Sequence, residues 1–321
     1  FVFLYWRELN SIFNTFIFLK NFFSIFGPTA SGKTNLSIQL AKKLNSEIIG
    51  VDSRQIYKMI PIGTAQPSPE ELNSVKHHLI GIKDLNDSIS AGEYVRLIDK
   101  TILTILDNKK TPILCGGTGL YLKSLVEGIF DGSKTNLKIR SLLEDEYING
   151  GKDTLYQKLI SIDPEYSKKV HPNNKKRLIR ALEIYKITGK NMTENFKSDN
   201  KKSRFYKNFH TIYLKISREN LQKRIYKRIL AMIENGMIEE VQSIREKKYK
   251  IDHIDYIGFS EISSFLDKDI SIDDAIEKIH IRTRQYAKRQ MKWFENQSFD
   301  NVFDMDNISI NDIVDKLVEM N

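Results

Sequence analysis

The stretch FFSIFGPTASGKT, residues 22–34, decides the fold of this chain. Its second part, GPTASGKT at 27–34, matches the phosphate-binding loop pattern G-x-x-x-x-G-K-[ST] at every fixed position. An apolar, β-prone run precedes the loop at 22–26, and a helix-like stretch follows it at 35–44. Strand, glycine loop and helix N-terminus together wrap backbone N–H groups around a di- or triphosphate. The sequence therefore predicts that the chain binds a phosphorylated ligand.

The side chains at the end of this loop have separate expected roles. Lys33 would place a point charge on the terminal phosphates, and the Thr34 hydroxyl would ligate Mg²⁺. The alternative is a glycine turn without a ligand. The predicted phosphate-binding residues are Gly27, Pro28, Thr29, Ala30, Ser31, Gly32, Lys33 and Thr34.

Two further apolar runs end in residues that can do chemistry. The run EIIGV at 47–51 ends in Asp52, and the run TPILC at 111–115 ends in a glycine-rich turn that contains Thr118. The carboxyl ends of parallel strands form the crevice where doubly wound sheets bind ligands. We therefore expect Asp52, Thr118 and the phosphate loop to converge on one site. Asp52 could be a metal ligand or a general base, or it could only cap the next helix.

The order of the predicted elements indicates one α/β core interrupted by a helical insertion. Up to about residue 128, short apolar runs alternate with helix-like stretches, as in a parallel sheet flanked by helices. From 131 to 203 amphipathic stretches replace the strands, and a strand then returns at 209–216. We predict a core formed by 22–130 and 204–321, and an all-helical insertion domain at 131–203.

Hydrophobic periodicity predicts the positions of the individual helices. The polar segment 191–207 breaks this pattern and is predicted to be a linker. The predicted helices span 35–44, 137–147, 154–160, 176–188, 218–236, 237–247 and 272–294.

Residues 1–21 form an atypical, Phe-rich hydrophobic extension. Charged residues such as Arg7, Glu8 and Lys20 interrupt its apolar runs, so we expect no continuous membrane span there. The segment also lacks a basic start followed by a small-residue cleavage site. We expect a non-native extension, with an organellar presequence as the alternative.

The charge balance favours an RNA partner without requiring one. The chain has 50 Lys and Arg against 41 Asp and Glu, a net charge of +9. Residues 280–292, HIRTRQYAKRQMK, include five Lys or Arg and no acid. Arg284, Lys288 and Lys292 fall on one helical face at a spacing of four. The alternative is a basic face that only contacts solvent.

Eight segments carry a resemblance to a known family. In order, they read GPTASGKT, VDSRQIYK, IGTAQPS, HHLI, SAGEY, GGTGLYLKSLVEG, HPNNKKRLIRALEIYKITGK and TRQYAKRQMKWF. The chain resembles the tRNA dimethylallyltransferases, also called tRNA Δ2-isopentenylpyrophosphate transferases, in their shorter, bacterial form. The resemblance runs from about residue 22 to beyond residue 294, and it implies a P-loop NTPase-like core.

The resemblance also implies a reaction. A family member transfers the dimethylallyl group of dimethylallyl diphosphate, held with Mg²⁺, to N6 of adenosine 37 in tRNAs that read codons beginning with U. The implied catalytic residues are Asp52 as the base, Thr118 as a hydrogen-bonding group near the reacting centre, and Arg140 at the entrance. Because adenosine 37 is stacked in the anticodon loop, the base must be extruded before it can react.

Contacts to the tRNA anticodon stem-loop are implied at three places. The segment that starts at Asp52 would hold the extruded base, and Gln55 has an amide donor and acceptor suited to an adenine edge. Two basic segments would contact the rest of the RNA. The implied residues are Asp52, Ser53, Arg54, Gln55, Lys176, Arg177, Leu178, Ile179, Arg180, Arg284, Lys288 and Arg289.

Three other functions remain open from the residues. A small-molecule kinase could use the same loop and Asp52, although it does not explain the basic segment at 280–292. An isopentenyltransferase could act on free adenine nucleotide, and an inactive RNA-binding protein could share the scaffold. The single cysteine excludes an intramolecular disulfide and fits a reducing cytoplasm. We expect a cytoplasmic monomer without a membrane partner.

Overall fold

The computed structural model describes residues 21–130, 136–198, 200–249, 251 and 253–320. The chain forms two compact units. The core unit consists of Phe1–Leu122 and Arg204–Asn321, and the helical unit consists of Lys123–Ser203. The helical unit therefore begins earlier than the predicted residue 131. The extension expected at 1–21 lies, except for Asn21, outside the described residues.

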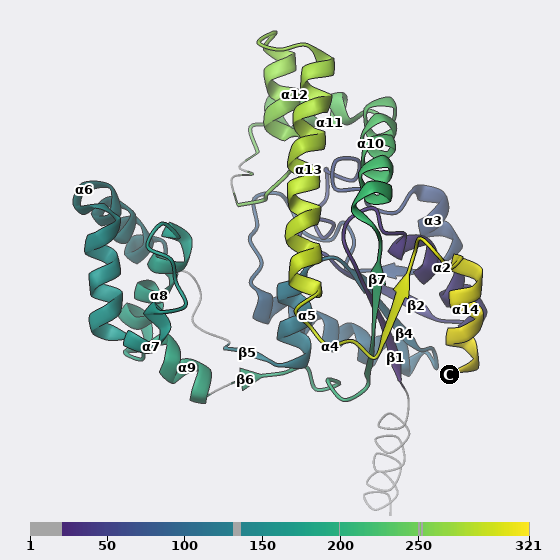
Figure 1. Ribbon diagram of the computed structural model, residues 1–321, viewed down its shortest axis with the longest axis horizontal. Coiled ribbons are helices and arrows are strands. Elements are labelled where there is room, and N and C mark those ends of the chain that lie inside the picture. The colour runs from purple at the N-terminus through teal and green to yellow at the C-terminus, as the bar shows by residue number, and fades with distance from the viewer. Residues whose placement is uncertain (1–20, 131–135, 199, 250, 252, 321) are drawn as a thin grey trace, which may run out of the picture. The chain divides into compact units, whose positions relative to one another are not determined.

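A six-stranded, fully parallel sheet forms the centre of the core unit, as Figure 1 shows. The central strand β1 pairs with β4 on one side and with β7 on the other. Every residue of β1 and β2 is buried, which explains why both read as continuous rather than alternating apolar runs. The predicted parallel α/β fold is confirmed. In sheet order the strands are β3 (His77–His78), β2 (Glu47–Val51), β4 (Pro112–Gly116), β1 (Phe22–Phe26), β7 (Phe209–Lys215) and β8 (Asn301–Asp304).

Helices flank this sheet and extend beyond it. In Figure 1, α10 and α13 run side by side away from the sheet, with α11 and α12 near their far ends. The bounds of α13 are those predicted, and α2, α10 and α11 differ from prediction by one or two residues at an end. The helices are α2 (Lys33–Leu44), α3 (Pro69–Ser74), α4 (Ala91–Asp107), α5 (Gly119–Val126), α10 (Arg218–Glu234), α11 (Met237–Glu246), α12 (Phe259–Leu266), α13 (Ile272–Phe294) and α14 (Ile310–Glu319).

Helix ends in the core unit follow local sequence rules. Ser271 caps α13 by accepting a hydrogen bond from the Asp274 N–H, while the Asp274 carboxylate accepts from the Ser271 N–H. By contrast, the N-cap residue of α2 is Gly32, which has a φ of 100° and no side chain that could accept a hydrogen bond. The N-terminus of α2 is therefore left without a side-chain cap, as a phosphate-binding helix requires.

The helical unit packs four helices around its own apolar core. The longest, α6 (Leu137–Ile162), merges the two helices predicted at 137–147 and 154–160 across a kink at Gly151, which has a φ of 77°. Leu155, Leu159 and Leu178 are among the buried side chains of this core. The other helices are α7 (Pro164–Ser167), α8 (Lys175–Thr188) and α9 (Met192–Ser198).

The prediction that 191–207 is a linker is wrong for the first half of that segment. Residues of this segment form α9 and the strand β6 (Asn200–Lys201), which pairs antiparallel with β5 (Ile129–Phe130). The insertion is therefore not built from helices alone. The start of α9 is stabilised because Asn191 and Glu194 exchange side-chain-to-backbone hydrogen bonds of 2.8 Å. This reciprocal cap indicates the start of a helix, although the polar composition of the segment had suggested a linker.

Candidate active site

Three strand ends of the core unit converge on one cavity. The phosphate loop follows β1, Asp52 follows β2, and Gly117 and Thr118 follow β4, and these three strands are neighbours in the sheet. A cavity of about 370 Å³ is lined by the phosphate loop, by Asp52 and by side chains of α10 and α13. The predicted convergence is therefore present, although two helices that the prediction did not assign to it complete the wall.

The phosphate loop places its lysine inside this cavity. Lys33 Nζ donates to the Pro28 carbonyl at 2.6 Å, which folds the side chain back across the loop. Burial lowers the pKa of Lys33 from 10.5 to about 8, and the nearby Arg228 guanidinium acts in the same direction. The loop turns through left-handed backbone at Ala30 and Gly32, with φ values of 61° and 100°. Among the described residues, the hydroxyl of the buried Ser31 finds no hydrogen-bond partner.

Two arginines of α10 bring further positive charge to the loop. Arg228 Nη1 donates to Thr29 Oγ1 at 3.1 Å, and Arg224 Nη1 donates to the Ser31 carbonyl at 3.3 Å. Both side chains line the cavity. Burial lowers the pKa of Arg228, whereas the charge of Asp52 opposes that shift. Sequence reasoning missed both arginines because their spacing of four is that of any basic stripe on an amphipathic helix.

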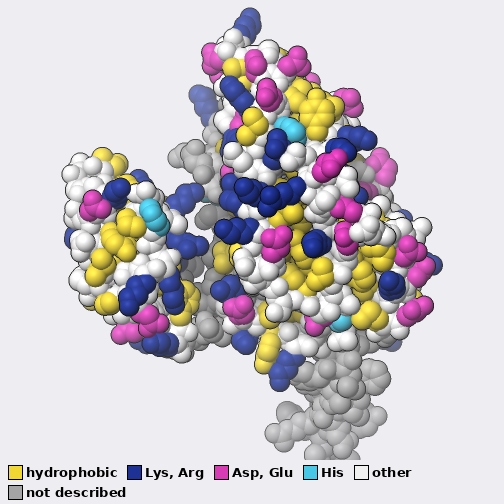
Figure 2. All heavy atoms as spheres, in the orientation of Figure 1, with side chains coloured by type: hydrophobic (Ala, Val, Ile, Leu, Met, Phe, Trp, Pro, Cys, Tyr) yellow, Lys and Arg dark blue, Asp and Glu magenta, His cyan; other side chains and the backbone are white. Residues whose placement is uncertain are grey.

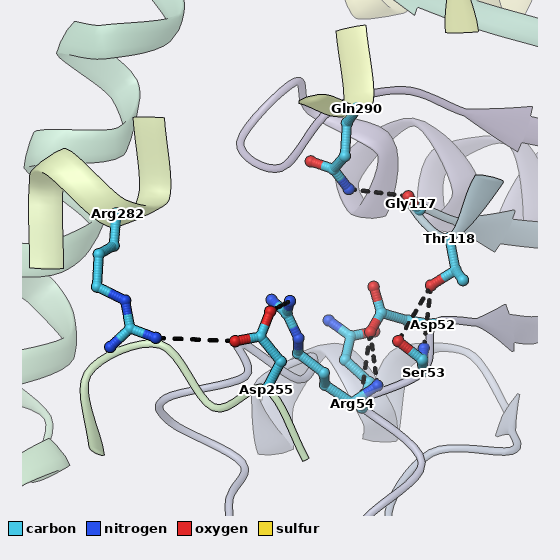
Figure 3. Close-up of polar contacts among 9 residues, drawn as sticks. Asp52, Ser53, Arg54, Gly117, Thr118, Asp255, Arg282 and Gln290 are labelled. Atoms are coloured by element: carbon cyan, nitrogen blue, oxygen red, sulfur yellow. Dashed lines mark hydrogen bonds and ion pairs between the residues drawn. The ribbon is translucent and has the colours of Figure 1, made fainter. Parts of the chain in front are cut away.

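Gln290 of α13 joins two of the converging loops. Its Nε2 donates to the Gly117 carbonyl at 2.8 Å, as Figure 3 shows, and its Oε1 accepts from the Thr29 N–H at 2.9 Å. The residue is buried. One amide thus fixes the phosphate loop against the turn after β4 by using both of its hydrogen-bonding ends. No pattern in the sequence indicates that this glutamine faces inward.

Asp52 is held at one oxygen and lines the cavity. Its Oδ1 accepts from the Arg54 N–H at 2.9 Å and from the Gln55 N–H at 3.4 Å. The turn-capping alternative is therefore also realised, because Oδ1 anchors the turn that follows β2. Oδ2 lies near Gly117, 3.7 Å from the position that a Cβ on that glycine would take. This second oxygen is the one that can accept a proton.

Thr118 lies beside the turn that carries Asp52, but it is not among the described residues that line the cavity. Its Oγ1 accepts from the Ser53 N–H at 3.1 Å, so the turns after β2 and β4 are joined directly (Figure 3). Beneath them, the buried Tyr94 hydroxyl donates to the Gly50 carbonyl at 2.8 Å. These contacts hold the end of β2, and with it Asp52, in a fixed position.

Arg54 is turned toward α13 rather than toward the phosphate loop. Its Nη2 is 2.8 Å from Asp255 Oδ2, and its guanidinium lies 4.2 Å from the centre of the Tyr286 ring. Arg282 is the second cation on Asp255, at 3.7 Å (Figure 3). Arg54 also lines the cavity. A planar cation stacked on a ring can present its edge to a nucleic acid.

The contacts of Gln55 correct the prediction that its amide offers an adenine both a donor and an acceptor. Its Nε2 donates to the Ala65 carbonyl at 2.6 Å and to the Thr64 carbonyl at 3.3 Å. The donor end of the amide is therefore already used within the protein. Gln55 lines the cavity, but it can offer an incoming base an acceptor rather than a donor–acceptor pair.

The basic face predicted on α13 is exposed. Arg284, Lys288 and Lys292, which were predicted to share this face, are all exposed, and so is Arg289. Figure 2 shows Lys and Arg side chains gathered at the middle of the visible face, over α13. This surface can contact phosphates, and its role in RNA binding stays a prediction.

The remaining predicted residues belong to the helical unit. Arg140 Nη2 lies 3.9 Å from Glu183 Oε2, and Arg180 Nη1 pairs with the same oxygen at 2.9 Å. Lys176 and Arg177 are exposed on α8. Leu178 and Ile179 are 0% and 2% exposed, so the predicted tRNA contact is wrong for their side chains. They lie on the apolar stripe that packs α8 into the core of this unit.

Comparisons with known proteins identify the family of the chain. The family model described as IPP transferase matches residues 55–297. The tRNA dimethylallyltransferase of Halothermothrix orenii is 42% identical over 284 residues, covering 88% of this chain and 86% of that protein. The Bacillus subtilis protein of the same name is 41% identical over 281 residues, covering 87% of this chain and 89% of its own.

Solved structures give the same result. The tRNA isopentenylpyrophosphate transferase of Bacillus halodurans is 34% identical, with a TM-score of 0.66 over 94% of this chain and 95% of that one. A eukaryotic dimethylallyltransferase acting on tRNA is 29% identical, with a TM-score of 0.77 over 94% of this chain and 80% of that one. The chain belongs to the IPP transferase family.

Proposed function

We propose that this chain transfers the dimethylallyl group of dimethylallyl diphosphate to N6 of adenosine 37 in tRNAs that read codons beginning with U. The products are N6-isopentenyladenosine in the tRNA and free diphosphate. The observation that carries the proposal is the single cavity in which a phosphate loop with three cations faces a carboxylate with one open oxygen. The names of the relatives, which are dimethylallyltransferases of tRNA, support the same reaction.

The cationic side of the cavity fits the diphosphate. Cleavage of the allylic C1–O bond leaves the electron pair on the diphosphate, so negative charge grows there in the transition state. Lys33 and the two arginines of α10 are held against the loop by hydrogen bonds, and together with the loop N–H groups they would surround this charge if the diphosphate binds there. Such preorganised donors stabilise the leaving group without having to reorganise during the reaction.

We include Mg²⁺ in the proposal because the donor set fits it. The Thr34 side chain lines the cavity at the start of α2. The described residues contain no cluster of three or more His, Cys, Asp or Glu that could hold a metal. Mg²⁺ commonly takes one or two protein ligands and completes its shell with water and substrate phosphates. Bound in this way, it would neutralise charge on the diphosphate.

The carboxylate side of the cavity fits the acceptor. The N6 amine forms a bond to C1 of the allyl group and must lose one of its two protons, because the alkylated nitrogen would otherwise carry a positive charge. Its lone pair is delocalised into the ring, so removal of that proton also helps a weak nucleophile to react. Asp52 Oδ2 is the acceptor we propose for that proton, while Oδ1 keeps the side chain in place. Thr118 holds the neighbouring turn beside it.

Exposed cations on α13 and α8 support an RNA substrate. Arg284, Lys288 and Arg289 of the core unit, and Lys176 and Arg177 of the helical unit, can reach phosphates without first breaking the protein core. A tRNA substrate also supports a location in the cytoplasm. Among the described residues, no helix is long and apolar enough to cross a membrane.

The first test is prenyl transfer from labelled dimethylallyl diphosphate to three acceptors. They are an anticodon stem-loop with adenosine at positions 36 to 38, the same loop with guanosine at 37, and free AMP. We expect label on the first alone. Asp52→Asn should lower kcat about 100-fold or more, since a general base contributes factors of that order.

Two results would contradict the proposal. Label on AMP would show an enzyme of free nucleotides. Absence of transfer with phosphorylation of an acceptor instead would show a kinase that uses the same phosphate loop. A Glu239→Gln variant, altered at an exposed carboxylate outside the cavity lining, serves as the control and should keep wild-type activity.

A further inference from the structure

A buried carboxylate outside the cavity lining is bound to a loop that forms part of the cavity wall. Glu240 of α11 is 9% exposed. Its Oε2 accepts from the Ile62 N–H at 2.8 Å, and its Oε1 accepts from the Gly63 N–H at 2.9 Å. The Tyr256 hydroxyl donates to Oε1 at 2.6 Å. Three donors thus converge on one carboxylate that the proposed chemistry does not use.

This carboxylate holds a segment against Tyr256. A Cβ added to Gly63 would overlap the Tyr256 ring and its hydroxyl oxygen, so the backbone approaches the ring more closely than any other residue would allow. Burial raises the pKa of Glu240, while the hydrogen bonds from Tyr256 and from the two amides favour its charged form. A buried carboxylate with three donors is costly to replace, because its donors would lose their partner.

The segment held by Glu240 in turn sets the amide of Gln55. Gly63 and Thr64 line the cavity. The Thr64 and Ala65 carbonyls both accept from Gln55 Nε2, at 3.3 and 2.6 Å. Gln66 Nε2 closes the loop by donating to the Gln55 carbonyl at 2.9 Å. Both carbonyls are acceptors, so they can pair with the NH₂ end of the Gln55 amide but not with its oxygen. The orientation of the Gln55 side chain is therefore fixed by these two partners.

A fixed Gln55 can distinguish purines. With the nitrogen engaged, the oxygen is the end of the amide that remains for a ligand. Adenine carries a donor at position 6, the exocyclic amine, whereas guanine carries an acceptor, O6. The oxygen of Gln55 attracts the first and repels the second. If the loop were released, the amide could rotate and serve either base.

We propose that Glu240 is a positioning residue for adenine selection, acting through the 62–65 loop on the orientation of Gln55. The inference rests on the proposed function, because it needs a purine of the RNA in the cavity. It assigns a role in base choice to a carboxylate that touches neither substrate. The rival is that Glu240 only stabilises the fold, in which case both substrates would be affected alike.

The test compares two stem-loops and one diphosphate. Dissociation constants are measured for the stem-loop with adenosine at 37 and for its guanosine counterpart, together with the KM for dimethylallyl diphosphate. In Glu240→Ala the preference for adenosine should fall about tenfold, the effect of losing the buried hydrogen bonds that orient the amide. The KM for dimethylallyl diphosphate should stay within about twofold of the wild-type value, because its phosphates bind elsewhere in the cavity.

Glu240→Gln keeps the size of the side chain and tests the same point if the alanine variant does not fold. Its amide oxygen can still accept from Gly63 and Tyr256, but its NH₂ group faces the Ile62 N–H. The preference should therefore fall less, by about threefold. Glu239→Gln, one residue away and exposed, is the matched control and should retain the full preference.

An unchanged preference in folded Glu240→Ala or Glu240→Gln would overturn the inference. So would a parallel loss of RNA and diphosphate binding, which would indicate a purely structural carboxylate. A wild-type chain that transfers no label to either stem-loop would instead contradict the proposed function. The two failures are therefore distinguishable by the wild-type reaction alone.

Discussion

Lys33 links the charge state of a single residue to substrate affinity. Its pKa of about 8 in the free protein follows from burial, because transfer from water penalises the ammonium form. A bound diphosphate favours that charged form and so raises the pKa. Below pH 8 the lysine is already protonated and binding needs no proton. Above pH 8 binding must take up a proton, so affinity falls as pH rises.

We therefore predict that the KM for dimethylallyl diphosphate is nearly constant below pH 7, about doubles by pH 8, and rises above pH 8 by up to about tenfold per pH unit. Calorimetry in two buffers of different ionisation enthalpy should detect proton uptake at pH 8.5. Lys33→Arg keeps its charge throughout this range and should show a flat profile. A flat profile in the wild-type chain would refute the assignment.

The residues whose convergence could be predicted from the sequence are those with a local signature. The loop at 27–34, Asp52 and Thr118 each follow an apolar strand, and parallel strand ends must meet at one edge. The place of Gln55 in the cavity follows from its position after the strand, whereas the two partners of its amide lie nine and ten residues away. Non-local hydrogen bonds leave no pattern in a single sequence.

At the scale of elements, α2, α10, α11 and α13 lie within two residues of their predicted bounds, whereas no range was predicted for α4, α12 and α14. The polar side chains that face inward were not predicted either. The bounds of α13 follow from its capping box and its apolar period. Gln290 on the same helix looks like any surface glutamine, yet it is buried between two loops. Arg224 and Arg228 of α10 were hidden in the same way. Which polar side chain of a helix faces a site depends on the packing of distant segments.

Gln290 should couple α13 to catalysis. In Gln290→Ala the Thr29 N–H and the Gly117 carbonyl both lose their partner, which should cost about 1–3 kcal/mol of unfolding free energy. The loosened phosphate loop should raise the KM for dimethylallyl diphosphate about tenfold, by the same order of energy. Chemical denaturation and steady-state kinetics measure the two effects. Gln285→Ala, at an exposed position of the same helix, is the control. Unchanged kinetics would contradict a role of Gln290 in holding the loop.

For the whole molecule, a net charge of +9 has meaning only through its distribution. Each phosphate contact releases counterions, so affinity for RNA falls with salt by a slope of about 0.7 per contact for single strands and about 0.9 for duplexes. Exposed cations that make such contacts should change both affinity and slope. Exposed cations elsewhere should change neither.

The double variant Arg284→Ala with Lys288→Ala tests the face of α13. We predict weaker binding of the anticodon stem-loop at every salt concentration and a log–log salt slope that is shallower by about 1.4 to 1.8, the loss of two phosphate contacts. The KM for dimethylallyl diphosphate should not change, because neither side chain lines the main cavity. Lys42→Ala with Lys43→Ala removes two equally exposed charges from the end of α2 and should leave the slope intact. Equal effects of the two double variants would show that net charge, rather than the α13 face, governs RNA binding.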